Sequence, residues 1–548
     1  MLLSRLPSNV SSLLPQKHGA PQLPRLSSHS NPTATQYVPS RSLQICSASY
    51  EDYAGGGPQR PAYAPRGGYG GRGGGGQRTQ GRPDRGPRNT DGGPQGQRSD
   101  VKGGRQSYLS FEQRAAYREV RDAINSCNNW RELASVIEAK SSIMDAENIS
   151  NVMVLLTWDG RPQDPEERAG FDSFLSTLMG WCLALMPTFA PHQTVKVLSS
   201  MAKLELYSEE LIGNLTEKII EQLGAFKNQE YGQIAEAFVR LGVTPDARFV
   251  AEFCTKTLPS VPNWFHDSLG SVLSFFVRTG VVPNPDWMEA ATGAYANRAR
   301  FFGREHFVDL LVLMGTTAKE TGWQPSQELL DRVLEGSKQL ISPQPRDQRF
   351  GGRGSQGGDK ESESGDRKQG RWQPKVKTVL VSDYTRLLWA LSNFNARPNR
   401  DWYANLYASL SRQQMYWTPE DIGAQAMYLG RYLQAPVTKD MADRLQRYLT
   451  NPGQVKLLGA DGAASLMYLL AISGVKPSEK WLDDMVIEMK TMLPEYSVLG
   501  LEMVYNGLPL LGSGFRLNEF LTDAANRYNE LVAAEQPDSG EPQMAEAQ

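Results

Sequence analysis

The chain has 548 residues, a formal net charge of -2 and an isoelectric point near 6.3, which excludes a uniformly basic nucleic-acid-binding protein. Its four cysteines, Cys46, Cys127, Cys182 and Cys254, form no CxxC pair and no cysteine–histidine cluster, so neither a zinc site nor a disulfide framework is indicated. No apolar run in the sequence approaches the roughly 20 residues that a membrane-spanning helix needs, and we expect no membrane insertion.

Residues 1–47 have the composition of an organellar transit peptide. No Asp or Glu precedes Glu51, whereas Arg and Ser residues are spread through the segment. Leaders that are poor in acidic residues and contain Ser and Arg are typical of mitochondrial and chloroplast targeting. The Ser- and Pro-rich composition favours the chloroplast stroma, with the mitochondrion as the alternative. A disordered tail of chance composition is the other interpretation.

Residues 48–107 are dominated by Gly, Pro, Gln and Arg, and we predict that they are disordered. Between residues 53 and 105, ten basic residues face three acidic ones, and Tyr63 and Tyr69 lie among them. Arginine pairs with phosphate and stacks on bases, and tyrosine stacks, so the segment predicts contact with single-stranded nucleic acid. A flexible spacer is the alternative. The arginines that we assign to this contact, including one from a later insertion, are Arg66, Arg72, Arg78, Arg82 and Arg353.

Residues 108–341 and 377–531 predict an all-α fold, because helix-forming residues there carry apolar side chains at i, i+3 and i+4. One pattern recurs in them. A large apolar residue near the end of a helix, the anchor residue, is followed by a proline seven residues later and an aromatic four residues after that. Phe276, Pro283 and Trp287 form one such triplet. Three others are Phe238, Pro245 and Phe249; Leu391, Pro398 and Trp402; and Leu470, Pro477 and Trp481.

Weaker anchors complete a repeat of about 38 residues. They are Leu155, Met201, Met314, Leu429 and Leu508. Successive anchors are 46, 37, 38, 38, 77, 38, 41 and 38 residues apart, and we interpret 77 as two repeats, one of which has lost its register. A period of this length fits two helices and two turns. Because one helix pair cannot bury its own apolar face, the repeat predicts an α-solenoid of stacked pairs.

Two further segments are predicted to be disordered. Residues 342–376 are rich in Gly and Arg and interrupt the repeat, and residues 532–548 are acidic and contain proline. We interpret the first as a long insertion between two halves of the helical array and the second as a tail.

Local motifs within the repeat resemble those of the octotricopeptide-repeat family, whose unit of about 38 residues contains Pro-Pro-x-x-Trp-Leu, Phe-x-Pro-Gln-x-Leu and Leu-Trp-Ala-Leu-Ala-x-Leu. The sequence LLWALSNF, residues 387–394, is similar to the last element, and residues 189–193 and 417–421 are similar to the middle one. The resemblance spans about residues 155–520, with most units degenerate. It implies an organelle-targeted protein that binds transcripts and affects their stability, processing, splicing or translation. The RAP domain of some relatives is not recognisable.

Two residues after the anchor, four units carry a basic residue. These residues are Lys203, Arg240, Arg278 and Arg431. Equivalent positions in a solenoid lie along one stripe, so we predict that these cations contact RNA phosphates. The alternative is that they stabilise helix C-termini through the helix dipole. Arg386, Arg397, Arg400 and Arg412 are weaker candidates, more typical of solvated surface.

Catalytic, metal-binding and cofactor motifs are not recognisable. The sequence contains no GxxxxGK[ST] phosphate loop, no HExxH and no GxSxG, and His192, His266 and His306 belong to no ligand motif. We therefore predict no enzyme activity and no cofactor. The sequence favours an organellar factor that binds single-stranded RNA, together with other proteins of a ribonucleoprotein. A protein-binding scaffold subunit of an organellar ribonucleoprotein or ribosome is the alternative.

Overall fold

The computed structural model describes residues 111–341, 379–450 and 452–535, which contain helices and no strands. The predicted all-α class is therefore confirmed for this part of the chain. The leader, the Arg/Gly-rich segment, the insertion and most of the acidic tail lie outside the described residues. So do the five candidate residues Arg66, Arg72, Arg78, Arg82 and Arg353. All described helices belong to one compact unit, residues 101–548.

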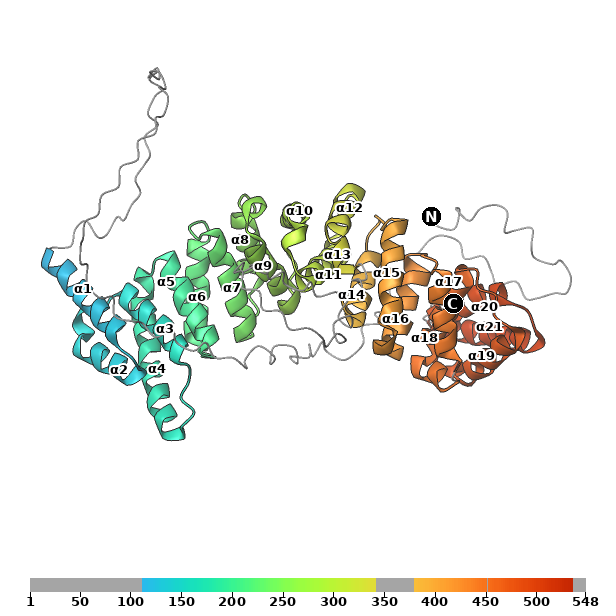
Figure 1. Ribbon diagram of the computed structural model, residues 1–548, viewed down its shortest axis with the longest axis horizontal. Helices are drawn as coiled ribbons and strands as arrows, with labels where there is room; N and C mark the ends of the chain where they lie inside the picture. The colour runs from blue at the N-terminus through green and yellow to red at the C-terminus, as the bar shows by residue number, and fades with distance from the viewer. Residues whose placement is uncertain (1–110, 342–378, 451, 536–548) are drawn as a thin grey trace, which may run out of the picture. The chain divides into compact units, whose positions relative to one another are not determined.

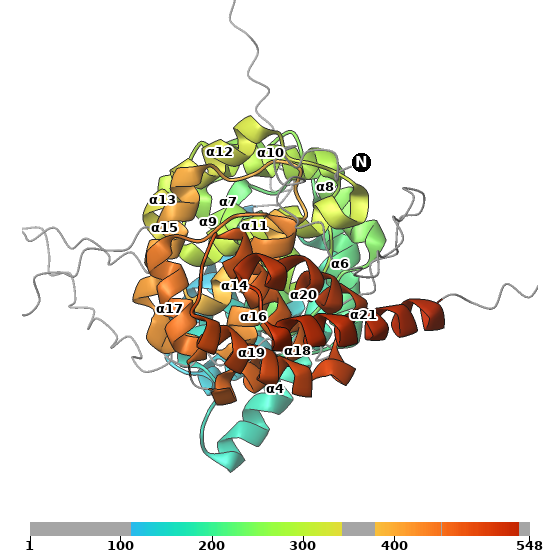
Figure 2. The same cartoon turned by 90° about the vertical axis from the view of Figure 1, so that its right-hand side faces the viewer.

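The helices alternate along the chain between two layers (Figures 1 and 2). The layer that carries the anchor residues, here called the anchor layer, consists of α3 (Ala146–Asp159), α5 (Pro191–Lys203), α7 (Asn228–Leu241), α9 (His266–Thr279), α11 (Arg304–Thr321), α14 (Val381–Ser392), α16 (Pro419–Met427), α18 (Pro452–Ile472) and α20 (Val498–Leu511). Each of these helices packs against the next one in this order.

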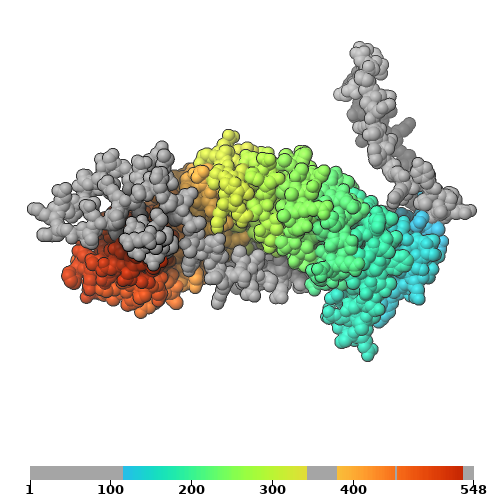
Figure 3. Space-filling view, turned by 180° about the vertical axis from the view of Figure 1, so that it is seen from behind, coloured from blue at the N-terminus to red at the C-terminus, as the bar shows by residue number. Residues whose placement is uncertain are grey.

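The partner layer consists of α2 (Trp130–Ala139), α4 (Pro165–Leu185), α6 (Glu209–Gln222), α8 (Ala247–Thr257), α10 (Pro285–Ala296), α12 (Gln327–Gly336), α13 (Lys338–Ile341), α15 (Arg400–Arg412), α17 (Lys439–Leu449), α19 (Glu479–Thr491) and α21 (Phe515–Glu535). Helix α1 (Phe111–Ser126) packs on α2 and α3. The first part of α4, in teal, projects beyond its neighbours in Figures 1, 2 and 3.

Every predicted anchor lies on an anchor-layer helix, or on the π-helical turn η8 (Tyr428–Tyr432) that continues α16. The eight anchors from Met201 to Leu508 are buried. The first anchor was misplaced by one residue, because Leu155 is half-buried whereas Leu156 is fully buried. The correction changes the first interval from 46 to 45 residues.

In α7 and α9 the carbonyl group of the anchor residue ends the helix. The Val281 amide donates to the carbonyl oxygen of the anchor Phe276 at 3.1 Å, and Gly280 adopts φ +69° between them. This is the hydrogen bond of a Schellman motif, which needs a left-handed residue that glycine adopts readily. The same bond joins Val243 to Phe238 at 2.9 Å.

The proline and the aromatic start the next helix. Asn284, which follows Pro283, accepts a hydrogen bond from the Trp287 amide at 2.8 Å and so caps the N-terminus of α10. The Trp287 side chain is buried, with its ring centroid 5.1 Å from that of Phe276, the anchor of the same triplet.

A second repeating apolar position, twelve residues before each anchor, was missed in the sequence. The residues there are Met144, Phe189, Phe226, Trp264, Phe302, Val379, Trp417, Leu458 and Tyr496. All are buried except the half-buried Trp417, and all but Leu458 precede the first turn of an anchor-layer helix. At Leu458 the adjacent Gly459 has φ +71°, so the backbone breaks inside α18 where other units have a turn.

The 77-residue interval between Met314 and Leu391 contains one unit, which corrects the prediction of two. Helix α11 packs directly against α14, and a Cβ atom on Gly315 would lie 2.7 Å from the Cα atom of Ala390. Residues 342–378, outside the described part, account for 37 of the 77 residues. The remaining 40 match one repeat.

Two expectations about apolar and terminal segments also change. By length and composition, residues 165–188 and 453–472 could cross a membrane, although core helices of soluble proteins pass the same test. Within the most apolar 18 residues of each segment, about 33% are buried in the first and 56% in the second.

Helix α21 continues to Glu535, four residues past the predicted end, because Val532–Glu535 includes the strong helix formers Ala533, Ala534 and Glu535.

Candidate nucleic-acid interface

All four predicted cations are exposed at the C-terminal ends of anchor-layer helices. Lys203, Arg240 and Arg278 lie in the last turns of α5, α7 and α9, which pack against one another in this order. Arg431 lies in η8, after α16. Thr316 and Asn393 occupy the equivalent positions of α11 and α14. The cations of three neighbouring helices therefore form a row, here called the cation row, and Arg431 is separated from it.

The surroundings of these cations differ. Arg240 pairs with Glu236 one turn earlier in α7 at 2.9 Å, and both side chains are exposed. Such a pair contributes little and leaves the guanidinium accessible. Lys203 forms no ion pair with a described carboxylate. Arg431 reaches Glu502 of α20 at 3.6 Å, across the intervening α18, so its charge is partly compensated within the fold.

Carboxylates lie near the N-terminal ends of several anchor-layer helices, of which α9 also carries a cation of the row. The position nine residues before the anchor is acidic in five units, with the residues Glu147, Asp267, Glu305, Glu420 and Asp461. Eleven residues of helix place these carboxylates about 16 Å from the cation positions. That separation exceeds the Debye length of about 10 Å at 0.1 M salt, so the carboxylates weaken phosphate binding at the row only modestly.

This polarity also agrees with the helix dipole, which favours acidic residues in the first turn and basic residues in the last. Asp267 and Glu305 lie in the first turns of α9 and α11, as Arg278 lies in the last turn of α9. Capping and RNA binding thus predict the same placement. If these cations serve only as helix caps, cations at the C-terminal ends of partner-layer helices should behave in the same way. If they bind RNA, only the cations of the anchor layer should affect RNA binding.

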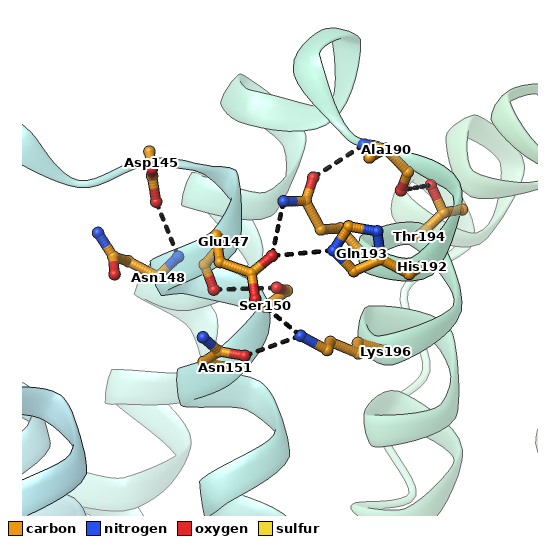
Figure 4. Close-up of polar contacts among 10 residues, drawn as sticks. All are labelled: Asp145, Glu147, Asn148, Ser150, Asn151, Ala190, His192, Gln193, Thr194 and Lys196. Carbon is orange, nitrogen blue, oxygen red and sulfur yellow. Dashed lines mark hydrogen bonds and ion pairs between the residues drawn. The ribbon is translucent and has the colours of Figure 1, made fainter. Parts of the chain in front are cut away.

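The most connected polar cluster surrounds Glu147 at the start of α3 (Figure 4). Its Oε1 accepts a hydrogen bond from Lys196 Nζ at 2.9 Å, and its Oε2 lies 3.0 Å from His192 Nε2. Gln193 Nε2 donates to Oε2 at 2.9 Å, and Lys196 also donates to Asn151 at 2.9 Å. These contacts join α3 to α5 across two repeat units.

The environment of Glu147 stabilises its charged form. Partial burial acts to raise its pKa, but the hydrogen bonds from Gln193, Lys196 and His192 outweigh it and lower the pKa from 4.5 to about 2. Lys196 is therefore held by a carboxylate and is less accessible to phosphate than Lys203. Sequence reasoning missed this cluster, because its members are 45 to 49 residues apart and no motif connects them.

The motif at residues 189–193 has a structural role in this cluster. Phe189 is buried, Pro191 begins α5, and Gln193 Oε1 accepts a hydrogen bond from the Ala190 amide at 2.8 Å. At residues 417–421, Thr418 caps α16 by accepting from the Asp421 amide at 3.2 Å. In both places the motif begins an anchor-layer helix.

The weaker arginine candidates make contacts within the fold or lie on its surface. Arg386 lies 3.5 Å from Asp309 of α11. The Arg397 guanidinium donates to the Phe394 carbonyl group just after α14. Arg400 and Arg412 are exposed. Of the four, only Arg386 lies on the exposed face of the anchor layer.

No group of three or more His, Cys, Asp or Glu side chains among the described residues could hold a metal ion. Cys127, Cys182 and Cys254 are free, and burial raises the pKa of Cys182 to about 12. A thiol with a raised pKa is a poor nucleophile near neutral pH.

No family model matches this chain, and no curated protein matches it. The resemblance to octotricopeptide repeats therefore depends on local motifs and on the repeat interval, and a function has to be argued from the surface of the anchor layer.

Proposed function

We propose that the two layers form an α-solenoid that binds single-stranded organellar RNA along the C-terminal ends of its anchor-layer helices. The observation that carries this proposal is the cation row. Lys203, Arg240 and Arg278 are exposed at equivalent positions of three helices in contact. A row of cations at regular spacing suits a phosphate backbone, whose charges also recur regularly.

Side chains beside the row vary between units, as recognition of different bases requires. Five residues before the anchor, α7 carries Gln233 and α9 carries Ser271. Amide and hydroxyl groups can donate to and accept from base edges. Phosphate contacts would then give affinity, and these positions would give sequence preference.

In this proposal the protein is a non-enzymatic factor that acts after transcription on specific organellar transcripts, as a divergent octotricopeptide-repeat protein would. The Ser- and Pro-rich leader favours the chloroplast stroma, with the mitochondrion as the alternative. The Arg/Gly-rich segment around Arg66 and Arg72 adds RNA contacts without sequence preference. Other proteins of a ribonucleoprotein are its expected partners.

The second candidate is a protein-binding scaffold, which the mixed charge of the anchor layer favours. Asp267 lies on the same helix as Arg278, and Glu305 lies on the next anchor-layer helix, α11. A surface with both signs of charge suits a protein partner as well as a nucleic acid. The two candidates differ in the salt dependence of RNA binding.

The test is RNA binding by the full chain across a salt series. Three phosphate contacts predict that log K falls with log salt concentration with a slope of about -2, at about -0.7 for each contact on a single strand. The same series on a variant with Arg66, Arg72, Arg78 and Arg82 changed to Ser separates the helical region from the Arg/Gly-rich segment. If that variant does not bind RNA, or binds with no salt dependence, the scaffold is the better interpretation.

A further inference from the structure

Exposed apolar side chains cluster in the turns that lead into anchor-layer helices. Phe265, which is 68% exposed, precedes α9, and Phe301, which is 53% exposed, ends the turn η6 (Ala299–Phe301) before α11. Equivalent turns of later units expose Leu380, Met415, Tyr416 and Leu457. These six are nearly half of the thirteen exposed large apolar side chains in the described part of the chain. Such a concentration is typical of a binding surface.

The turn before α11 combines this exposure with a stack of charged and aromatic groups. The Cζ atom of Arg300 lies 4.7 Å from the ring centroid of Phe301. The His266 ring centroid lies 5.5 Å from the Phe301 centroid, with the planes 32° apart. Arg298 donates to the Pro262 carbonyl oxygen at 3.0 Å and so ties η6 to the turn of the preceding unit. Phe301 is therefore held in place by Arg300 and His266, and the residue is still 53% exposed.

The charge at this turn is positive. Arg298, Arg300 and Arg304 lie within seven residues, against Glu305 as the nearest acidic neighbour in the sequence. Arg300 forms no ion pair with a described carboxylate, and the nearby Asp267 is 3.2 Å from His266. An accessible guanidinium over an exposed aromatic ring suits a nucleobase, which stacks, and its phosphate, which the arginine attracts.

We propose that Phe301 and Arg300 form a stacking site for one base of single-stranded RNA. The site is separate from the cation row. Phe265 and His266 mark the start of α9, whereas Arg278 lies twelve residues after His266, about 18 Å along the helix. The inference depends on the proposed function, because its ligand is the same RNA.

The test compares Phe301→Ala and Arg300→Ala with Phe515→Ala, which removes an exposed ring (84%) at the start of α21. The binding of an unstructured oligouridylate to each variant is measured by fluorescence anisotropy across a salt series. We expect Phe301→Ala to weaken binding by about 5- to 150-fold with an unchanged salt slope. Arg300→Ala should also make the slope shallower by about 0.7. Phe301→Tyr should bind like the unchanged chain, because it keeps the ring.

A second readout reports the stack directly. A 2-aminopurine placed within the oligonucleotide loses fluorescence when it stacks, and Phe301→Ala should restore part of that fluorescence at saturating protein. Helical circular dichroism and thermal unfolding establish that each variant is folded.

The outcomes separate the two proposals. If the unchanged chain does not bind RNA, both proposals fail. If it binds with the expected salt slope but Phe301→Ala behaves like Phe515→Ala, the stacking site is wrong and the cation row stands. A protein partner that binds only when Phe301 is present, with RNA affinity unaffected, would also overturn the stacking site.

Discussion

The indole Nε1 of Trp287 donates a hydrogen bond of 3.0 Å to the Oγ1 atom of Thr257, and both side chains are buried. Trp287 lies in the first turn of α10 and Thr257 at the end of α8, so the bond joins two successive partner-layer helices. The Trp287 ring also meets Trp264 edge-on, with the centroids 6.3 Å apart. The aromatic residue of the repeat thus connects one unit to the previous one.

Replacing Trp287 should destabilise this junction. We expect Trp287→Phe to lower the free energy of unfolding by about 1–3 kcal/mol, because it removes the hydrogen bond and leaves a gap in a packed core. Urea denaturation followed by circular dichroism measures the change. Trp158→Phe is the matched control, since Trp158 is 76% exposed and should change stability by less than about 0.5 kcal/mol. Equal effects of the two substitutions would contradict this role for Trp287.

Replacing Gly280, which ends α9, by alanine should destabilise the protein, whereas replacing Gly293, inside the nearby helix α10, should not. Gly280 has φ +69°, a conformation that costs an L-residue about 1–2 kcal/mol. Gly293 lies within α10, and an added Cβ atom there would meet nothing within 4 Å. Gly280→Ala should therefore lower the melting temperature, and Gly293→Ala should raise stability by about 0.5–1 kcal/mol. Stabilisation by both substitutions would show that the Schellman turn is not needed.

Features of the fold that are specified by residues close together in the sequence could be predicted. The helix ends could be predicted because Pro283, the cap Asn284 and the aromatic Trp287 lie within five residues and specify a turn and a helix start. The exposure of Arg240 and Arg278 could also be predicted, because each lies two residues after a buried anchor.

Contacts between units could not be predicted in the same way. Glu147 and Lys196 are 49 residues apart, and their pairing depends on how α3 and α5 pack. The 77-residue interval was misinterpreted for the same reason. Its length equals two repeats, and only the contact of Gly315 with Ala390 shows that α11 and α14 are neighbours.

Excising residues 342–378 should leave the fold intact. The Val379 amide donates to the Leu340 carbonyl oxygen at 3.2 Å, so the two ends of the insertion are adjacent. Joining Ile341 to Val379 through about four Gly or Ser residues should stabilise the protein by up to about 2 kcal/mol, because a shorter loop costs less entropy to close. Calorimetry would show a single transition at an equal or higher temperature. Two separate transitions would mean that α11 and α14 do not hold the halves together.

The Glu147 cluster predicts a dependence of stability on pH. Because the folded pKa of Glu147, about 2, is below its ordinary value of 4.5, its contribution is present above pH 4.5 and is lost as the pH falls toward 2. With 40% of the side chain exposed, solvent screening reduces this contribution to about 1 kcal/mol. Glu147→Gln should therefore be less stable than the unchanged chain at pH 7 and nearly equal to it at pH 2 in urea denaturation. Glu166→Gln, at an exposed position of α4, is the control and should show no such convergence.

The cation row can be distinguished from helix capping by reversing charges in both layers. Arg240→Glu with Arg278→Glu should weaken binding to single-stranded RNA and make the salt slope shallower by about 1.4, at about 0.7 for each lost phosphate contact. Lys256→Glu is the matched control, because Lys256 is an exposed cation in the last turn of α8, in the partner layer. If these cations serve only the helix dipole, all three sites should lower stability by similar small amounts and none should affect RNA. If they bind phosphate, only the anchor-layer pair should change affinity, while helical circular dichroism stays the same in every variant.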